Sequence, residues 1–365
     1  MGNFDPAFFA AKEWLILVPP ETPQTEKCAG DLSRCIGLLS EINGGSAARP
    51  PGIAEAGDLK ASGKYALIVL NCKGSGPERN GFEWRAGPER VEIFGESCRG
   101  LCNGVYSFLA ALGISWPSPG DEKLPVRGFT PASDSVCGPS HFEGENPAAA
   151  PWKRFVPAGK SGIKKALNSR ENFAAWAARN RYDALIFPLW AFASGKTGQK
   201  LMRLKESVST YCIALEAGGH DLSSLLPRKH FVFHRDYFRM EEGKREKEHH
   251  FCPTNPGAIA LIGREAKKLF RAAGETKVFH LWPDKGAEAA WCSCPTCRAF
   301  TTQEQNRIAV NTAADVLAKT SPSALISFLE KPGDGGKSPV NIPLRKNTFI
   351  TEKLPQEPVA WGKKP

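Results

Sequence analysis

The stretch from Phe279 to Cys297, FHLWPDKGAEAAWCSCPTC, decides how the fold of this chain is interpreted. It begins inside an apolar run over residues 277–282 that predicts a short buried strand, and Asp284 follows where that strand ends. An acidic residue at the carboxyl end of a barrel strand stands where α/β barrels carry their chemistry. The stretch closes on a tight group of cysteines, Cys292, Cys294 and Cys297. Three thiols at this spacing are typical of a metal site or of a locally stapled loop.

Length and composition predict a protein of two domains with substantial cores, because the chain has 365 residues of which 41% are apolar. No run of about 18 apolar residues is present, so no membrane-spanning helix is expected. Residues 1–20 lack the basic segment, apolar core and small-residue cleavage site of a secretory signal. The 11 scattered cysteines, an odd number, favour reduced thiols over a disulfide framework. We therefore expect a cytoplasmic protein with no membrane partner.

The formal net charge of +10 raises the question of nucleic-acid binding. The lysines and arginines are dispersed, with only short local groups such as Lys164–Lys165 and Lys363–Lys364. No zinc-finger, RNP or helix-turn-helix signature accompanies them. A solvated basic surface therefore explains the charge, and no nucleic-acid partner is expected.

The first part of the chain predicts a small α/β domain over residues 1–124. Its expected elements are a strand at 14–18, a helix at 25–42, a strand at 65–70, a hairpin of 82–84 with 90–94, and a helix that ends at Gly113. A proline-rich stretch follows this last helix, and the domain boundary is placed near Leu124.

From residue 126 onward, strand patterns alternate with helical ones. The expected strands are 126–130, 182–189, 209–215, 277–282, 324–329 and 340–344, and the expected helices are 163–181, 256–273 and 302–319. Such alternation predicts a parallel sheet and, repeated this often, a TIM-type β/α barrel over residues 125–347. A closed barrel needs eight strands, so about six predict an incomplete barrel or an open sheet. A Lys/Pro-rich tail is expected over 348–365.

Residues 95–125, GESCRGLCNGVYSFLAALGISWPSPGDEKLP, resemble the segment that closes the N-terminal domain of family 67 α-glucuronidases and of family 20 β-hexosaminidase relatives. The second domain is similar to the bacterial domain-of-unknown-function family 4838. The matching stretches are 176–181, 218–227, 234–245, 252–256 and 284–297. The resemblance implies a β/α barrel behind a small α/β domain, acting on or binding a sugar. One departure is His234-Arg-Asp-Tyr-Phe238, where the family has His-Pro-Glu-Tyr-Phe.

Glycoside hydrolysis uses one carboxyl that protonates the leaving oxygen and a second carboxylate across the sugar ring. The resemblance implies Asp284 as the general acid, because both related enzyme families place an acidic catalytic residue after this strand. The alternative is a turn aspartate in a Pro-Asp-Lys-Gly loop. Glu330, at the end of the strand over 324–329, is the candidate second carboxylate, and the alternative is a solvated strand-end charge.

His220 follows Glu216-Ala-Gly-Gly219, where the glycines would let a ligand approach the backbone and the imidazole could bind sugar hydroxyls. The long connection after it holds further candidates for substrate binding, His234, Tyr237 and Arg245. Arginine suits an anionic sugar carboxylate, with an exposed basic loop as the alternative. Trp190 and Trp282 fall at strand ends, where flat rings suit pyranose faces, with core packing as the alternative.

The cysteine trio lacks a fourth ligand nearby, although structural zinc sites take four. Cys252, His280 or a residue distant in sequence would have to complete the set, so reduced thiols in a compact loop are expected and no cofactor is assigned. Three functions remain open. They are a glycoside hydrolase that uses acid/base catalysis, a non-catalytic carbohydrate-binding remnant of such an enzyme, and a zinc-stabilised binding module. Substrate, stereochemistry and oligomeric state stay undetermined at this stage.

Overall fold

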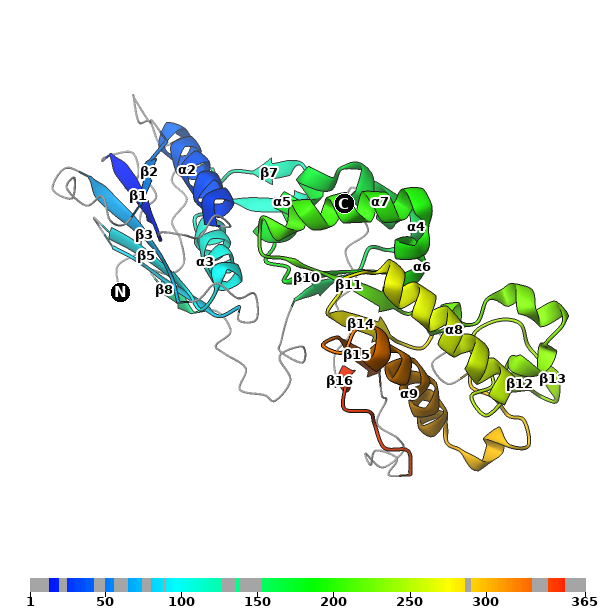
Figure 1. The fold of residues 1–365 in the computed structure, drawn as a ribbon. Helices are drawn as coiled ribbons and strands as arrows, with labels where there is room; N and C mark the ends of the chain where they lie inside the picture. Colours follow the sequence, from blue (N-terminus) through cyan, green and yellow to red (C-terminus); the bar gives the residue numbers. More distant parts are fainter. Residues whose placement is uncertain are drawn as a thin grey trace.

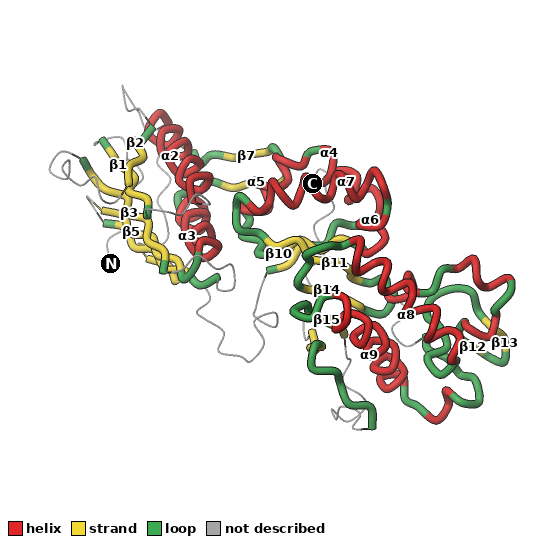
Figure 2. The backbone as a smooth tube through the Cα atoms, viewed as in Figure 1, coloured by secondary structure: helices red, strands yellow, loops and turns green. Residues whose placement is uncertain are grey.

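The computed structural model describes residues 13–19, 25–42, 50–55, 65–73, 80–87, 90–126, 135–137, 153–285, 290–329 and 341–351. Two separate sheets organise these residues, each of six strands. Helices flank both sheets, as Figure 2 shows by colour. Within the described part of the chain, none of the helices combines the length and the apolarity needed to span a bilayer.

The first sheet has the strand order β2-β1-β3-β5-β4-β8. Its strands are β1 (Trp14–Val18), β2 (Gly52–Glu55), β3 (Ala66–Cys72), β4 (Phe82–Ala86), β5 (Arg90–Gly95) and β8 (Ser135–Cys137). Helices α2 (Thr25–Ile42) and α3 (Cys98–Ala111) cover one face of it (Figure 1). A hairpin of β6 (Ser115–Ser118) and β7 (Asp121–Lys123) follows α3. The strand β8 lies beyond Leu124 and nevertheless pairs with β4.

Glycines in the 95–104 stretch allow α3 to press against this sheet. A Cβ at Gly95 would collide with the backbone of Leu101, and one at Gly100 would collide with the carbonyl oxygen of Gly81. Ser97 caps the helix, because its hydroxyl accepts a hydrogen bond from the Gly100 N–H at 3.1 Å. The glycine-bearing motif is therefore explained by close packing of a helix on a sheet.

The second sheet has the order β16-β15-β14-β11-β10-β9, and its strand pairs are all parallel. Its strands are β9 (Arg154–Phe155), β10 (Ala184–Phe187), β11 (Ala214–Gly219), β14 (Val278–Leu281), β15 (Leu325–Leu329) and β16 (Thr348–Thr351). Its helices are α4 (Gly159–Asn168), α5 (Arg170–Arg179), α6 (Leu189–Ala193), α7 (Gly195–Ser209), α8 (Pro256–Ala272) and α9 (Thr302–Thr320). The sheet curls into a half-barrel with these helices outside it (Figure 1). The predicted α/β class and β/α architecture are confirmed.

The six parallel strands are not the six expected ones. The strand predicted over 126–130 is described only at Val126, which lies outside a strand, and β9 occupies the first position instead. The strand predicted over 340–344 is also wrong, because residues 341–344 form bends and coil. In its place, β16 pairs with β15 inside the stretch predicted as a tail. Strands as short as β9 have too few residues to show a period.

The helical predictions erred at two places. The helix expected over 163–181 is divided into α4 and α5 at Ser169, whose φ of −115° and ψ of 41° depart from helical values. Helix α7 was not predicted, and it runs to Ser209, so β11 begins at Ala214 instead of residue 209. Helix α7 buries only Gly198, Leu201, Leu204 and Val208, which leaves a weak apolar stripe in its sequence.

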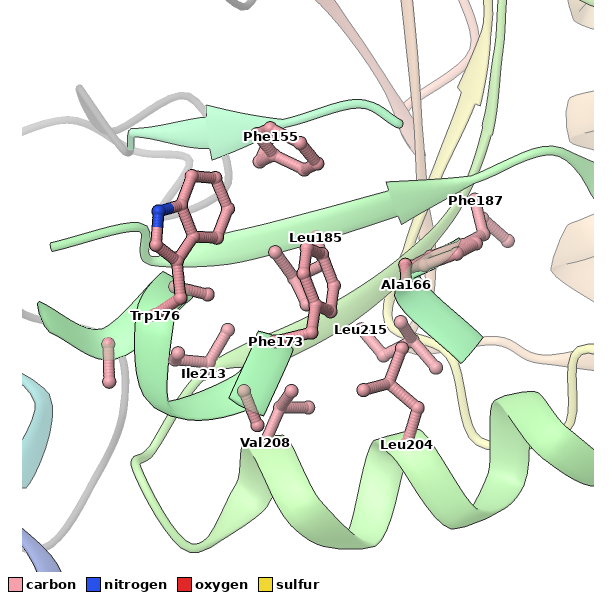
Figure 3. Packing of buried hydrophobic residues seen from close by; sticks show 14 of the residues in the cluster. Phe155, Ala166, Phe173, Trp176, Leu185, Phe187, Leu204, Val208, Ile213 and Leu215 are labelled. Atoms are coloured by element: carbon pink, nitrogen blue, oxygen red, sulfur yellow. The ribbon is translucent and has the colours of Figure 1, made fainter. Parts of the chain in front are cut away.

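The core of the second sheet lies between its strands and the helices α4, α5 and α7, as Figure 3 shows. Phe155 of β9 meets Trp176 of α5 edge to face, with ring centroids 5.1 Å apart, and lies 5.7 Å from Phe173. Leu204 and Val208 approach from α7. These aromatic contacts bind the short strand β9 to the sheet, since two residues of ladder pairing alone would hold it weakly.

A buried ion pair and a disulfide connect the two halves of the molecule. Asp183, just before β10, pairs with Arg99 of α3 at 3.2 Å and also accepts hydrogen bonds from Asn80 and Asn103. Cys98 and Cys212 form a disulfide across the same junction. The expectation of reduced thiols throughout is therefore wrong for this pair.

The connection between β11 and α8, residues 220–255, is the longest excursion from the second sheet in the described chain. It contains three short 3-10 helices, η3 (Leu222–Leu225), η4 (Arg228–Val232) and η5 (Arg235–Tyr237), and a hairpin of β12 (Met240–Glu241) with β13 (Lys244–Arg245). It lies beside the N-terminal ends of α8 and α9 (Figure 1). In a parallel β/α fold these helix ends follow the carboxyl ends of the strands, so the excursion covers the face where such folds bind ligands.

Candidate functional site at the carboxyl ends of β11 and β14

Two aspartates follow neighbouring strands on this face. Asp221 comes two residues after β11, and Asp284 comes three residues after β14, which is the strand next to β11 in the sheet. The Asp221 Oδ2 atom accepts the backbone N–H of Leu189 at 3.0 Å. The Asp284 Oδ1 atom accepts the N–H of Ser223 at 3.2 Å. Backbone donors from rigid elements therefore fix both carboxyl groups at the same end of the sheet.

The two carboxyl groups are electrostatically coupled. Burial raises the pKa of Asp221 to about 7, the N–H of Leu189 opposes this rise, and the negative charge of Asp284 adds to it. Within the described part of the chain, the Asp221 Oδ1 atom is buried without a hydrogen-bond partner. A buried carboxyl beside another carboxylate keeps its proton, because two adjacent negative charges in a poorly solvated place are unfavourable. Asp221 therefore carries a proton up to near neutral pH.

Basic residues of the excursion surround Asp284. His249 Nδ1 lies 3.8 Å from Asp284 Oδ2, which makes an ion pair whenever the ring is protonated. The backbone of His249 has φ 63°, in the left-handed region that a non-glycine residue rarely adopts. Arg228 donates hydrogen bonds to the carbonyls of Ser223 and Lys247, so it ties both walls around Asp284 together. The left-handed backbone of His249 is a strained conformation of the kind that recurs at functional sites.

His220 also belongs to this face. Its Nδ1 atom lies 2.7 Å from the carbonyl oxygen of Pro283, which can only accept, so Nδ1 carries a proton and Nε2 is the acceptor of the neutral ring. Gly218 and Gly219 precede it with φ near 120° (118° and 122°). A Cβ at Gly218 would collide with the carbonyl of His280. Gly218 thus lets β11 approach β14 closely, and His220 bonds to the residue just before Asp284.

A family model described as a domain of unknown function, DUF4838, matches residues 149–351, which contain the whole of this face. The chain belongs to the DUF4838 family. A comparison with curated proteins finds no match. Solved structures share the fold of this DUF4838 protein at low sequence identity. The GH20 β-N-acetylhexosaminidase of Streptomyces coelicolor A3(2) has a TM-score of 0.51 and 9% identity, with 93% of this chain and 65% of that chain covered.

Two further structures show the same similarity. The chitobiase of Flavobacterium johnsoniae has a TM-score of 0.51 and 13% identity, over 96% of this chain and 52% of that one. The protein CpGH89 of Clostridium perfringens has a TM-score of 0.53 and 10% identity, over 90% of this chain and 39% of that one. The DUF4838 chain thus spans from 39% to 65% of the length of these three. At such identities the similarity establishes a glycosidase-like fold and no more.

A directed hydrogen-bond chain lies beneath the site of the DUF4838 protein. The Trp282 indole N–H donates to Ser327 Oγ at 3.0 Å, and this hydroxyl lies 2.6 Å from His280 Nδ1. His280 Nε2 lies 2.8 Å from Glu216 Oε2, which also accepts from Arg154 Nε at 2.8 Å. Because indole only donates and carboxylate only accepts, the chain is satisfied by a neutral His280 protonated on Nε2.

The charges in this chain follow from its burial. Burial lowers the pKa of His280 although Glu216 opposes the change, which agrees with a neutral ring. Burial also works against ionisation of Glu216, but Arg154 and the bond from His280 outweigh it and lower the pKa of Glu216 to about 2. Trp282 is only 1% exposed, so its ring supports His220, 5.3 Å away, and offers no free face to a sugar.

The other predicted residues are dispersed. Trp190 on α6 is 36% exposed, and it adjoins Leu189, whose N–H binds Asp221. His234 stacks on Tyr237, with centroids 4.6 Å apart, in the outer part of the excursion. Arg245 donates to the carbonyl of Phe238 at 2.7 Å and lies 3.8 Å from Cys292 Sγ, so it lies next to the cysteines. Glu330 lies outside the described residues.

Three residues of the face were missed or left open by sequence. Asp221 follows a strand end just as Asp284 does, and applying that rule to every strand would have found it. His249 gave no signal, because only folding of the excursion brings it to Asp284. Cys252 was one of several candidates for a fourth ligand, and the structure places its sulfur among those of the cysteine trio. The four sulfurs of Cys252, Cys292, Cys294 and Cys297 all lie within 4.8 Å of one another. His280, the other candidate, is hydrogen-bonded to Glu216 and Ser327.

Proposed function

We propose that this DUF4838 protein hydrolyses a glycosidic bond at the face where β11 and β14 end, with Asp284 as the proton donor to the leaving oxygen. The observation that carries the proposal is the pair of carboxyl groups, Asp221 and Asp284, held by backbone donors at the ends of neighbouring strands. The glycosidase-like fold supports the choice of reaction, and position within the fold supports the choice of face.

Asp221 and Asp284 would have different roles because their side chains differ in exposure. Asp284 is partly exposed, with 18% of its side-chain surface accessible, and can meet a sugar oxygen. Asp221 is buried and has a raised pKa of about 7, so below that pH it adds no negative charge to the site. Asp221 is therefore a positioning residue, which its hydrogen bond from the Leu189 N–H holds beneath the proton donor.

The reaction consumes one water. As the bond between the anomeric carbon and the leaving oxygen breaks, Asp284 gives its proton to that oxygen. Water then adds to the anomeric carbon, and its released proton restores the acid. Glu330, which directly follows β15, is the proposed second carboxylate, and its separation from Asp284 would set the stereochemistry, with retention near 5 Å and inversion near 6.5–9.5 Å.

Binding of the sugar would use the exposed groups nearest to this pair. Trp190 offers an exposed indole beside the residue that binds Asp221. An aromatic face suits the apolar side of a pyranose ring. The Nδ1 of His220 is bonded to the Pro283 carbonyl, so its Nε2 is the ring nitrogen that remains for a hydrogen bond with a sugar hydroxyl.

The test is turnover of a panel of aryl glycosides, uronides and N-acetylhexosaminides by the full chain, with Asp284→Asn and Asp315→Asn as matched variants. Asp315 is half-exposed on α9 and pairs with Arg345, so it makes the same chemical change at a distant surface. We expect Asp284→Asn to lose about 10²–10⁴-fold in kcat/KM and Asp315→Asn to retain full activity. Absence of turnover with every substrate, or undiminished turnover in Asp284→Asn, would overturn the proposal. Saturable sugar binding without turnover would favour the carbohydrate-binding alternative.

A further inference from the structure

We propose that Cys252, Cys292, Cys294 and Cys297 bind one structural zinc ion that fixes the 220–255 excursion against the loop after β14. Three of these residues come from the short Cys-x-Cys-x-x-Cys stretch, and the fourth comes from the end of the excursion, 40 positions before Cys292. The proposal is independent of sugar chemistry.

The spacing of the sulfurs matches tetrahedral coordination. Cys252 Sγ lies 3.7 Å from Cys294 Sγ and 3.6 Å from Cys297 Sγ, and the four sulfurs lie within 4.8 Å of one another. A Zn–S bond of about 2.3 Å in a regular tetrahedron puts neighbouring sulfurs about 3.8 Å apart. The observed distances are far longer than a disulfide bond of about 2.05 Å. The cluster therefore has the size of a metal tetrahedron and not that of paired cystines.

The site is closed as structural zinc sites are. All four cysteines are buried, at 5% exposure or less. Four protein ligands leave no coordination position for water or substrate. Tetrahedral sites with four sulfur ligands are typical of zinc or of iron, and zinc is favoured because it has no redox requirement and no preference for another geometry.

Hydrogen-bond donors point at the sulfurs, as thiolate ligands require. The N–H of Met240 approaches Cys292 Sγ at 3.3 Å, and the Arg245 guanidinium approaches the same sulfur at 3.8 Å. The Thr254 hydroxyl lies 3.1 Å from Cys297 Sγ. Four thiolates around Zn²⁺ carry a net charge of −2, so the positive charge of Arg245 and these donors stabilise the site. This also accounts for the contacts of Arg245.

The backbone around the ligands is held independently of any metal. The Gln305 side chain accepts the N–H of Cys292 at 3.0 Å and donates to the Cys292 carbonyl at 3.1 Å. The N–H of Ser293 donates to the Met240 carbonyl at 2.8 Å. These bonds attach the cysteine loop to α9 on one side and to the β12–β13 hairpin on the other. Such a preformed loop lowers the entropic cost of placing four thiolates around one ion.

The position of the cluster connects it to the carboxyl face. Cys252 comes three residues after His249, and Cys292 comes eight residues after Asp284. His250 and Trp291 stack with centroids 4.4 Å apart, directly beside the two ligands. A zinc ion there would tie together the two segments that carry His249 and Asp284, so that loss of the ion would loosen both walls of the face.

The first test is the metal content of the full chain, measured by elemental analysis after purification without chelator, for wild type, Cys252→Ser and Cys72→Ser. Cys72 is half-buried in β3, in the other sheet, and removes one thiol without touching the cluster. We expect one zinc per chain in wild type and in Cys72→Ser, and loss of zinc in Cys252→Ser. Less than a tenth of an equivalent of zinc in wild type, iron in its place, or disulfides between these cysteines by mass spectrometry would overturn the proposal.

A second measurement covers the outcome in which Cys252→Ser fails to fold. Cys252→His replaces one zinc ligand by another, so it should retain zinc. Treatment of wild type with a strong chelator should increase amide hydrogen exchange in residues 238–255 and 291–300 while β1 and β3 stay protected. Equal exchange with and without the chelator, in protein shown to have lost its zinc, would contradict the structural role. These readouts do not depend on turnover of any sugar.

Discussion

Asp183 and Arg99 form a buried ion pair that joins the two sheets, with Asp183 Oδ1 lying 3.2 Å from Arg99 Nε and the side chains only 4% and 1% exposed. Asp183 also accepts hydrogen bonds from Asn80, Asn103 and the N–H of Lys153. The carboxylate is thus saturated by donors from both halves of the chain. Each charge of such a pair requires the other, because either charge alone would be buried without compensation.

Asp183→Asn should destabilise the protein by about 3–5 kcal/mol, because the variant leaves Arg99 charged and buried without a carboxylate. Urea unfolding at neutral pH measures the change. Asp315→Asn removes the half-exposed pair with Arg345 and should cost no more than about 1 kcal/mol. Equal midpoints for the two variants would contradict a structural role for the Asp183 network.

Glu216 should make the free energy of unfolding depend on pH in the acid range. The pKa of Glu216 is depressed in the folded protein to about 2 from its ordinary 4.5. Its contribution is therefore fully present above 4.5 and is lost as pH falls toward about 2. Glu216→Gln should lower the free energy of unfolding by about 3–5 kcal/mol at neutral pH, since the variant removes the carboxylate that pairs with Arg154. Thermal unfolding across the acid range should then show a shallower decline in the variant than in wild type. Parallel pH curves would refute this assignment.

Asp221 should make the free energy of unfolding change with pH in the opposite direction. Its pKa is raised in the folded protein from 3.8 to about 7, so the stability that it contributes is fully present below 3.8 and declines as pH rises toward about 7. One pKa unit corresponds to about 1.4 kcal/mol, so the decline amounts to at most about 4 kcal/mol. Asp221→Asn should remove this decline in unfolding experiments. Carbon-13 NMR titration offers a direct check, since Asp284→Asn should lower the Asp221 pKa, and an unchanged value would show that the carboxyl groups are not coupled.

Substitutions of Trp190 and Trp282 should distinguish a role in sugar binding from a role in core packing. Trp190→Ala should raise KM, or weaken sugar binding, while changing the free energy of unfolding by about 1 kcal/mol or less, because the indole is partly exposed. Trp282→Ala should destabilise the protein by about 3–5 kcal/mol, because it empties a fully buried volume and leaves Ser327 without its donor. A variant of Trp190 that binds sugar as wild type does would exclude this ring from the site.

Elements with strong local signals were predicted well from the sequence. Helix α8 begins at Pro256 after an Asn255 side chain that accepts the Ala258 N–H, and α9 begins after a capping box of Thr301 and Glu304. The strands β14 and β15 are also visible in the sequence as apolar runs, because a strand that is buried on both faces requires apolar residues. The strands β9 and β16 carried no comparable signal, because they are short and are defined by the partner strand to which they bond.

The sequence by itself determined that a β/α sheet follows a small α/β unit, and that Asp284 stands at a strand end, because these features depend on periodicity and on chain order. Only the tertiary structure decided which groups surround that residue. Asp221 reaches it through the parallel pairing of β11 with β14, and His249 reaches it through the return of the excursion. Cys252 likewise meets Cys297 across 45 positions of chain. Such contacts depend on how distant segments fold back in space, and local sequence patterns do not encode that distance.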